Sequence, residues 1–194
     1  MLSLSKRLDV DYVEQTKKYC EQLITIYDKL NMKEEYCKEL EGYLIQYRQF
    51  DLKYYKMLKA EITNEQKWSE IVDRIVEHNP CERLVCDVLQ DEKRYEQLMC
   101  KIEQTSGNVE LLDRYERVLR KNNPDKVIKI YVKYLSEAVE CANDRNKYKH
   151  LMPYLKKIAA CSGGGSVAKD IAKAWRQEYK RRSAMMDELK KAGF

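Results

Sequence analysis

The chain has 194 residues, of which 36% are charged and 44% hydrophobic, with only 6 glycines and 3 prolines. A composition poor in helix breakers and rich in charge favours helices over sheet, and a chain of this length can bury about 70% of its unfolded surface. Its apolar runs are far shorter than the roughly 18 residues of a membrane span, which excludes a membrane protein.

Seven cysteines occur at irregular spacings, and the first ten residues lack the continuous apolar segment of a secretory signal. Disulfide frameworks are typical of short secreted chains, so we expect reduced thiols on apolar helix faces. A soluble, cytoplasmic protein is the resulting expectation.

The net charge of +5 is unevenly distributed. Between Asn143 and Phe194 there are 13 Lys and Arg against 5 Asp and Glu, a net charge of +8, whereas the rest of the chain carries 24 against 27, a net charge of −3. This excess favours an acidic partner, nucleic acid included, although a solvated helix face explains it equally well.

The first two predicted helices carry apolar stripes rich in tyrosine. The first is expected over Asp11–Leu30, and Asn31 followed by Glu34 resembles a capping box that begins the second. The two stripes consist of Tyr12, Tyr19, Leu23, Ile26, Tyr27 and Leu30, and of Tyr36, Leu40, Tyr43, Leu44 and Tyr47. Each helix is therefore expected to bury its stripe against a neighbour.

Five shorter helices are expected next. The third begins at Asp51, and the fourth begins at a second capping box, Thr63 with Gln66, and ends before Pro80. The remaining three are expected over Cys81–Gln90, Asp91–Gln104 and Asn108–Lys121, with a turn at Ser106 and Gly107.

The stretch from Asn123 to Cys161 predicts a helical hairpin. Asn123 and Pro124 suit the start of one helix, and Asp144 begins the other. The two apolar stripes are Ile128, Tyr131, Leu135, Ala138, Val139 and Ala142, and Tyr148, Leu151, Met152, Leu155, Ile158 and Ala159. Neither stripe can avoid water alone, so further helices must pack on both sides.

An aromatic residue followed by apolar residues three, four and seven positions later recurs at Trp68, Tyr95 and Tyr148, with a degenerate copy at Tyr36. The successive spacings of 32, 27 and 53 residues are close to those of helix-pair repeats. We therefore predict an all-α fold, a right-handed α-solenoid of antiparallel helix pairs resembling tetratricopeptide arrays, with about eleven helices. An irregular helical bundle is the alternative.

The segment Ser162–Ser166 reads SGGGS and predicts a hinge or loop, because consecutive glycines disfavour a helix. It would divide a helical-repeat array, residues 1–161, from C-terminal capping helices, residues 167–194, which Ser166 and Ser183 are expected to begin. A phosphate-binding loop is not indicated, because no strand and no GxxxxGK motif accompany the glycines.

From Leu111 onward the chain resembles the C-terminal helical region of bacterial SWIM zinc-finger proteins. The resemblance covers about the last 85 residues, and its most specific part is the closing RRSAMMDELKKAGF. At Cys161 to Ser166 the glycine run replaces a more usual turn. The CxC and CxH pairs of such a finger do not occur in the chain, so no metal site is expected from the resemblance.

No other set of residues predicts catalysis or metal binding. His78 with Cys81 and Cys86 is the nearest approach to a metal cluster, but the five-residue spacing turns the two thiols apart on a helix. The other histidine, His150, lies on a predicted helix surface, which gives no nucleophile pair. We expect no enzyme activity and no cofactor.

The predicted function is a non-enzymatic helical-repeat scaffold that binds another protein or peptide. The alternative is a nucleic-acid-associated helical module that uses the basic last third of the chain. The candidate contacts for nucleic acid or an acidic partner are Lys169, Lys173, Arg176, Lys180, Arg181 and Arg182, with Lys190 and Lys191 nearby.

Overall fold

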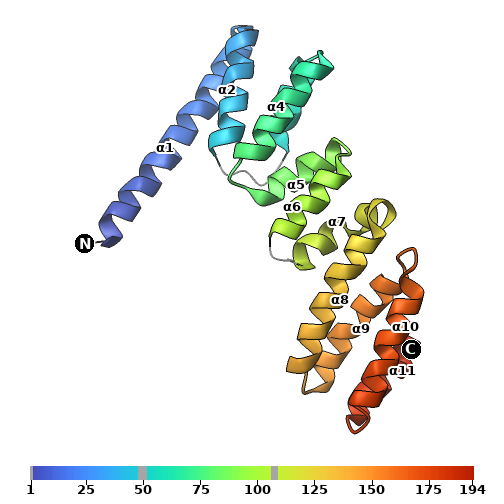
Figure 1. Ribbon diagram of the computed structural model, residues 1–194. Helices are drawn as coiled ribbons and strands as arrows, with labels where there is room; N and C mark the ends of the chain where they lie inside the picture. Colours follow the sequence, from blue (N-terminus) through green and yellow to red (C-terminus); the bar gives the residue numbers. More distant parts are fainter. Residues whose placement is uncertain (1, 48–51, 106–108) are drawn as a thin grey trace. The chain divides into compact units, whose positions relative to one another are not determined.

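A computed structural model describes residues 2–47, 52–105 and 109–194, with side chains from Tyr12 onward, and confirms an all-α fold. Within these ranges there are eleven helices and no strand (Figure 1). In chain order they are α1 (Leu2–Lys29), α2 (Lys33–Gln46), α3 (Lys53–Glu61), α4 (Glu65–His78), α5 (Glu82–Asp91), α6 (Tyr95–Gln104), α7 (Val109–Asn122), α8 (Pro124–Cys141), α9 (Arg145–Ala159), α10 (Gly164–Glu178) and α11 (Ser183–Ala192).

The chain divides into two compact units, Met1–Glu92 and Lys93–Phe194. In the first unit, α2 packs against α1, α3 and α4, and α4 packs against α5. In the second unit, α7 packs against α6 and α8, and α9 packs against α8, α10 and α11. The predicted boundary at 162–166 thus separates two helices, α9 and α10, that lie against each other in one unit.

Most predicted apolar stripes form the cores. All five stripe residues of α2 are buried, as are Trp68, Ile71, Val72 and Ile75 of α4. In α8, Val127 is buried in place of the predicted Ile128, while Tyr131, Leu135 and Val139 are buried as expected. Helical periodicity therefore identified which side of these helices faces the core.

The stripe of α1 does not follow this pattern. Tyr12, Tyr19 and Leu30 are 71%, 67% and 62% exposed, and Leu23 and Ile26 are also exposed. Ile24, which is not in the predicted stripe, is buried, and Tyr27 of the predicted stripe is half-buried. Helix α1 therefore packs on α2 through a neighbouring side, and the expectation that this stripe is buried was wrong.

Helix ends agree with the prediction at some positions only. The side chain of Asp144 caps α9 by accepting a hydrogen bond from the backbone N–H of Lys147, at 2.9 Å. Asn64, not Thr63, caps α4. Asn31 ends α1 with a left-handed φ of 53° and forms no capping box, because α2 begins at Lys33. The predicted helix start at Asp51, the turn at Ser106 and Gly107, and the start at Asn108 lie outside the described residues.

The glycine run is a short turn that leads directly into α10. Gly163 has a left-handed φ of 75°, and α10 begins at Gly164, two residues before the predicted cap Ser166. A Cβ on Gly164 would lie 2.0 Å from the backbone oxygen of Ile158, so only glycine fits there. Within the segment expected to be a hinge or loop, Gly164 is therefore packed against the end of α9, whereas Ser162, Gly163 and Ser166 are exposed.

Candidate functional site

Five of the six basic residues predicted to contact nucleic acid are exposed on α10 or in the turn that follows it. Lys169 and Lys173 lie on α10, and Lys180 and Arg181 follow its end. Arg176 is exposed as well, but its Nη2 donates a hydrogen bond to the backbone oxygen of Phe194. Lys169 and Lys173 have the helical spacing expected from the sequence, whereas Lys180 lies in the turn after α10, which ends at Glu178.

Arg182, the sixth residue, has a structural role. Its Nη1 donates a hydrogen bond to the carbonyl oxygen of Ala142 at 2.8 Å and lies 3.4 Å from the hydroxyl oxygen of Tyr148. Its guanidinium carbon lies 4.4 Å from the centre of the Tyr179 ring, a cation–π contact. The guanidinium group thus holds the ends of α8, α9 and α10 together, and this role had no signal in the sequence.

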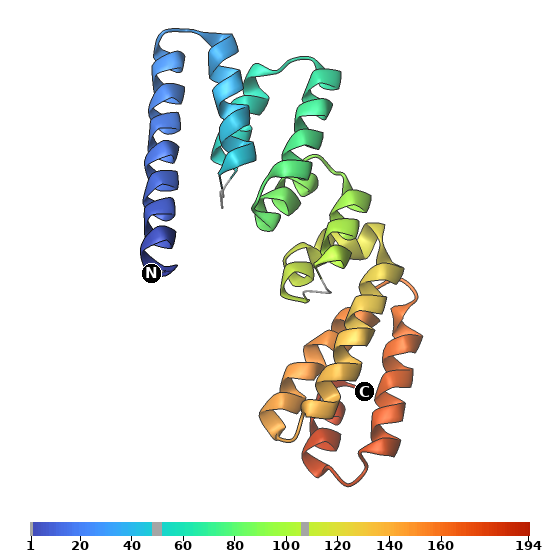
Figure 2. The same ribbon diagram turned by 60° about the vertical axis from the view of Figure 1, so that its left-hand side comes forward.

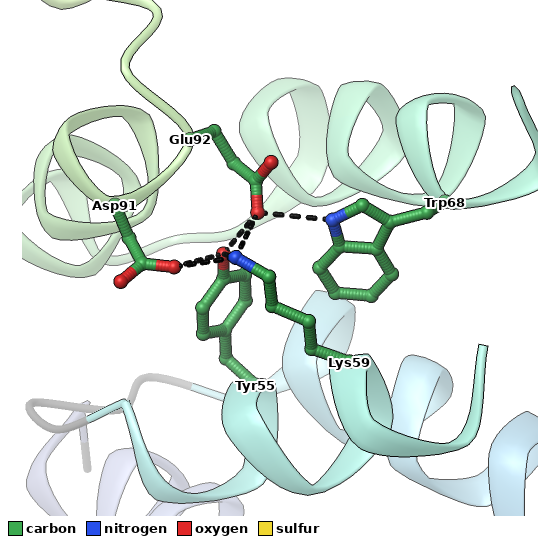
Figure 3. A network of polar contacts seen from close by, with 5 residues as sticks. All are labelled: Tyr55, Lys59, Trp68, Asp91 and Glu92. Carbon is green, nitrogen blue, oxygen red and sulfur yellow. Dashed lines mark hydrogen bonds and ion pairs between the residues drawn. The ribbon is translucent and has the colours of Figure 1, made fainter. Parts of the chain in front are cut away.

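In the first unit, five polar or aromatic side chains from α3, α4 and the end of α5 converge on one point (Figure 3). Lys59 Nζ lies 2.7 Å from Asp91 Oδ2 and 2.8 Å from Glu92 Oε1. The Tyr55 hydroxyl is 2.9 Å from Asp91 Oδ2 and also hydrogen bonds to Glu92, while Trp68 Nε1 donates to Glu92 Oε1 at 2.9 Å. We call these residues the Lys59 cluster.

The contacts of the Lys59 cluster stabilise the usual ionisation states of its members. Burial opposes the charge of Glu92, but hydrogen bonds from Lys59, Tyr55 and Trp68 outweigh burial and lower its pKa. The hydrogen bond from Lys59 lowers the pKa of Asp91, and burial with the two carboxylates raises the pKa of Tyr55. Burial opposes the charge of Lys59, but both carboxylates outweigh it and raise its pKa. A general acid or base needs a pKa near the working pH, and these shifts move each group away from neutrality.

The second unit contains a similar cluster, which we call the Asp113 cluster. Asp113 Oδ1 on α7 lies 2.7 Å from the hydroxyl of Tyr131 on α8 and 2.5 Å from Nζ of Lys157 on α9. Tyr154 donates a hydrogen bond to Asp113 Oδ2 at 3.3 Å, and Lys157 Nζ lies 4.8 Å from the centre of the Tyr154 ring. Burial, with the Asp113 carboxylate, raises the pKa of Tyr131 and raises that of Tyr154 to about 12. Three consecutive helices are joined by this cluster.

The candidate metal residues are not brought together. Cys81 and Cys86 are buried in the first unit, whereas His78 is exposed and its Nδ1 lies 3.0 Å from the backbone oxygen of Arg74. Among the described residues, no group of three potential ligands is close enough to hold a metal ion. Of the other cysteines, Cys161 is buried, Cys20 and Cys37 are half-buried, and Cys100 and Cys141 are exposed.

Helix α1 carries the most exposed apolar surface described in the chain. Figures 1 and 2 show α1 running along α2 and then well past its end. With 28 residues it is about 42 Å long, against about 21 Å for the 14 residues of α2. The exposed apolar residues here are Tyr12, Val13, Tyr19, Leu23 and Ile26 of α1 and Leu30 just after it. Five of them lie in one line, which we call the α1 stripe: Tyr12, Tyr19, Leu23, Ile26 and Leu30.

The spacing of the α1 stripe is that of a coiled-coil seam. Tyr12, Tyr19 and Ile26 are seven residues apart, and Leu23 and Leu30 follow Tyr19 and Ile26 by four. Residues at these steps form one narrow apolar line along a helix, the kind that a second helix covers. Exposed apolar surface of this continuity marks an interaction site more often than an isolated exposed leucine does.

No described helix is both long enough and apolar enough to cross a membrane. Comparisons with models of protein families, with curated protein sequences and with solved structures found no match for this chain. The resemblance of the last 85 residues to SWIM zinc-finger proteins therefore stays a prediction from the sequence.

Proposed function

We propose that the chain is a non-enzymatic helical-repeat scaffold that binds another protein, with helix pairs arranged as a tetratricopeptide-like solenoid. The α1 stripe is the observation that carries this proposal. Five large apolar side chains at seam spacing remain exposed on a helix that extends beyond its neighbour α2. Covering them would transfer apolar surface out of water, at about 25 cal/mol for each Å² buried.

The two polar clusters support a scaffold rather than an enzyme. Their lysines, tyrosines and carboxylates satisfy one another, and each cluster joins several helices of its own unit. Groups that are paired in this way stabilise a fold but are poorly suited to proton transfer at neutral pH.

The alternative, a nucleic-acid-associated module, has lost part of its support. Arg176 and Arg182 make contacts within the second unit, which leaves Lys169, Lys173, Lys180 and Arg181 as the exposed predicted contacts. The observation in its favour is that Lys169 and Lys173 are exposed one turn apart on α10, and we rank this alternative second.

Photo-crosslinking tests the proposed function. A benzophenone amino acid replaces Tyr19 in the α1 stripe, or Lys38 on α2 as the control, because Lys38 faces the hollow between α2 and α4. Irradiation of cells that produce each variant should give discrete protein adducts at position 19 that are absent at position 38. The same adducts at both positions, or none at position 19, would contradict protein binding through α1. Adducts that nuclease removes would favour the alternative.

A further inference from the structure

The two edges of the α1 stripe differ in chemistry. On one edge, Tyr27 is half-buried and packs against the core of the first unit. On the other edge, exposed side chains recur at steps of three, four and seven residues, which places them in one row on a helix: Gln15, Lys18, Gln22 and Lys29. Among the side chains that the structure describes, from Tyr12 onward, this row has two cations, two amides and no carboxylate, and we call it the lysine edge.

The carboxylates of this part of α1 lie elsewhere. At about 100° of rotation per residue, Glu14, Glu21 and Asp28 fall on the side of α1 roughly opposite to the α1 stripe. Glu21 is already engaged there, because its Oε1 accepts a hydrogen bond from the hydroxyl of Tyr43 on α2. A partner lying along the α1 stripe would therefore meet positive charge and amide groups on its solvent side.

The surface between the stripe and the lysine edge is hollowed. Gln15, Lys18, Tyr19 and Gln22 line a hollow of about 350 Å³. A second hollow of about 460 Å³ lies on the same helix and is lined by Lys18, Glu21, Gln22, Thr25 and Ile26. Its one carboxylate, that of Glu21, accepts the hydrogen bond from Tyr43. Each hollow combines an apolar stripe residue with Lys18, so a side chain of a partner could make apolar and ionic contacts together.

We propose that the α1 stripe and the lysine edge bind one amphipathic helix of a partner protein, whose apolar face is flanked by Asp or Glu. This inference rests on the proposed function and names the chemistry of the partner. The seam spacing of the stripe requires a helix, since only a helix repeats apolar residues in register with it. The lysine edge favours negative charge beside the apolar face of the partner helix. Charged positions beside a coiled-coil seam select partners in the same way.

The test uses two synthetic heptad peptides of 21 residues with leucine at both seam positions. The acidic peptide has glutamate at the flanking positions, and the basic peptide has lysine there. Fluorescence anisotropy with the full chain should show about tenfold tighter binding of the acidic peptide at physiological salt, because two exposed ion pairs replace two repulsions. Raising the salt concentration should reduce this preference.

Charge reversal of the lysine edge gives the matched variants. The double variant Lys18→Glu with Lys29→Glu should reverse the preference, whereas Lys38→Glu, on the other side of α2, should leave it unchanged. Leu23→Glu should weaken the binding of both peptides. Circular dichroism should show that every variant keeps its helix content.

Several outcomes would overturn the inference. Equal binding of both peptides, a preference for the basic one, or a preference that survives charge reversal would show that the lysine edge selects nothing. A dimer of the chain that forms in sedimentation and disappears in Leu23→Glu would instead assign the α1 stripe to a second copy. If the acidic peptide does not bind but crosslinked adducts form at position 19, only this inference is contradicted. If neither binding nor adducts are observed, the proposed function is contradicted as well.

Discussion

Nη1 of Arg182 donates a hydrogen bond to the carbonyl oxygen of Ala142, at 2.8 Å, across 40 residues of sequence. Ala142 is the C-terminal cap of α8, where carbonyl groups have no partner within the helix and the helix dipole is negative. A cation at this position therefore satisfies a carbonyl group and interacts favourably with the dipole. Arg182, which belongs to a run of basic residues, therefore stabilises the fold through this contact.

Replacing Arg182 should therefore reduce stability. We expect Arg182→Ala to lower the free energy of unfolding by about 1–3 kcal/mol, since it removes a charged hydrogen bond and the contact with Tyr179. Arg181→Ala, at the exposed neighbouring position, should change it by less than about 0.5 kcal/mol. Urea denaturation followed by circular dichroism measures the free energy of unfolding of both variants. Equal effects would show that the contact with Ala142 contributes nothing to stability.

The second prediction concerns Glu92. Glu92→Gln keeps the shape of the side chain but leaves Lys59 with one carboxylate, so we expect the free energy of unfolding to fall by about 1–2 kcal/mol. The control Glu70→Gln, on the exposed side of α4, should hardly change it. Because the folded pKa of Glu92 is lowered, its contribution is present above the unfolded pKa of about 4.3 and is lost as the pH falls through the folded value. The difference between wild type and Glu92→Gln, measured by thermal unfolding, should therefore shrink at low pH. A difference that stays constant down to low pH would argue against the ionic role.

The third prediction concerns Tyr154 at high pH. Its folded pKa is raised to about 12, so its contribution to stability is present below the unfolded value of about 10 and is lost as the pH rises toward 12. In a spectrophotometric titration, Tyr154→Phe should remove one late-ionising tyrosine, and Asp113→Asn should bring that ionisation to a lower pH. Tyr134, whose ring centre lies 4.7 Å from that of Tyr154, also raises the pKa of Tyr154, so Tyr134→Phe should lower that pKa as well. Loss of an early-ionising group in Tyr154→Phe would contradict the assignment.

The glycine turn allows a comparison of neighbouring positions. Gly164→Ala places a methyl group 2.0 Å from the Ile158 oxygen, so it should destabilise the second unit by more than about 2 kcal/mol. Gly165 has open space around its Cα, and alanine there should be neutral or stabilising by up to about 1 kcal/mol. Thermal unfolding measures the stability of both variants, and equal effects would contradict the close contact at Gly164. Limited proteolysis of the wild type should not cut preferentially between Cys161 and Ser166.

Helical period was sufficient to predict the class of fold and most of its core. The stripes of α2, α4 and α9 are buried because apolar residues at steps of three and four can leave water only by packing. The same rule failed at α1, because a periodic stripe shows that a helix has an apolar side but not whether the chain supplies a neighbour for it. The Tyr12 to Leu30 stripe looks the same in sequence as the stripes that are buried.

The polar clusters could not have been predicted in the same way. Tyr55 and Lys59 are four residues apart and must share a helix face, but nothing in the sequence indicates that Asp91 and Glu92 reach them from the end of α5. Asp113 likewise meets Lys157 from 44 positions away in the chain. Contacts between helices depend on how the helices pack, which local patterns do not encode.

The distribution of the seven thiols provides a chemical means of following each unit. Cys100 and Cys141 are exposed in the second unit, so a maleimide dye should attach there in the folded protein. Cys81 and Cys86 in the first unit and Cys161 in the second are buried and would react only when their surroundings open. With the exposed pair blocked beforehand, mass spectrometry of labelled fragments at increasing urea concentration would record the opening of each unit separately, without any engineered probe.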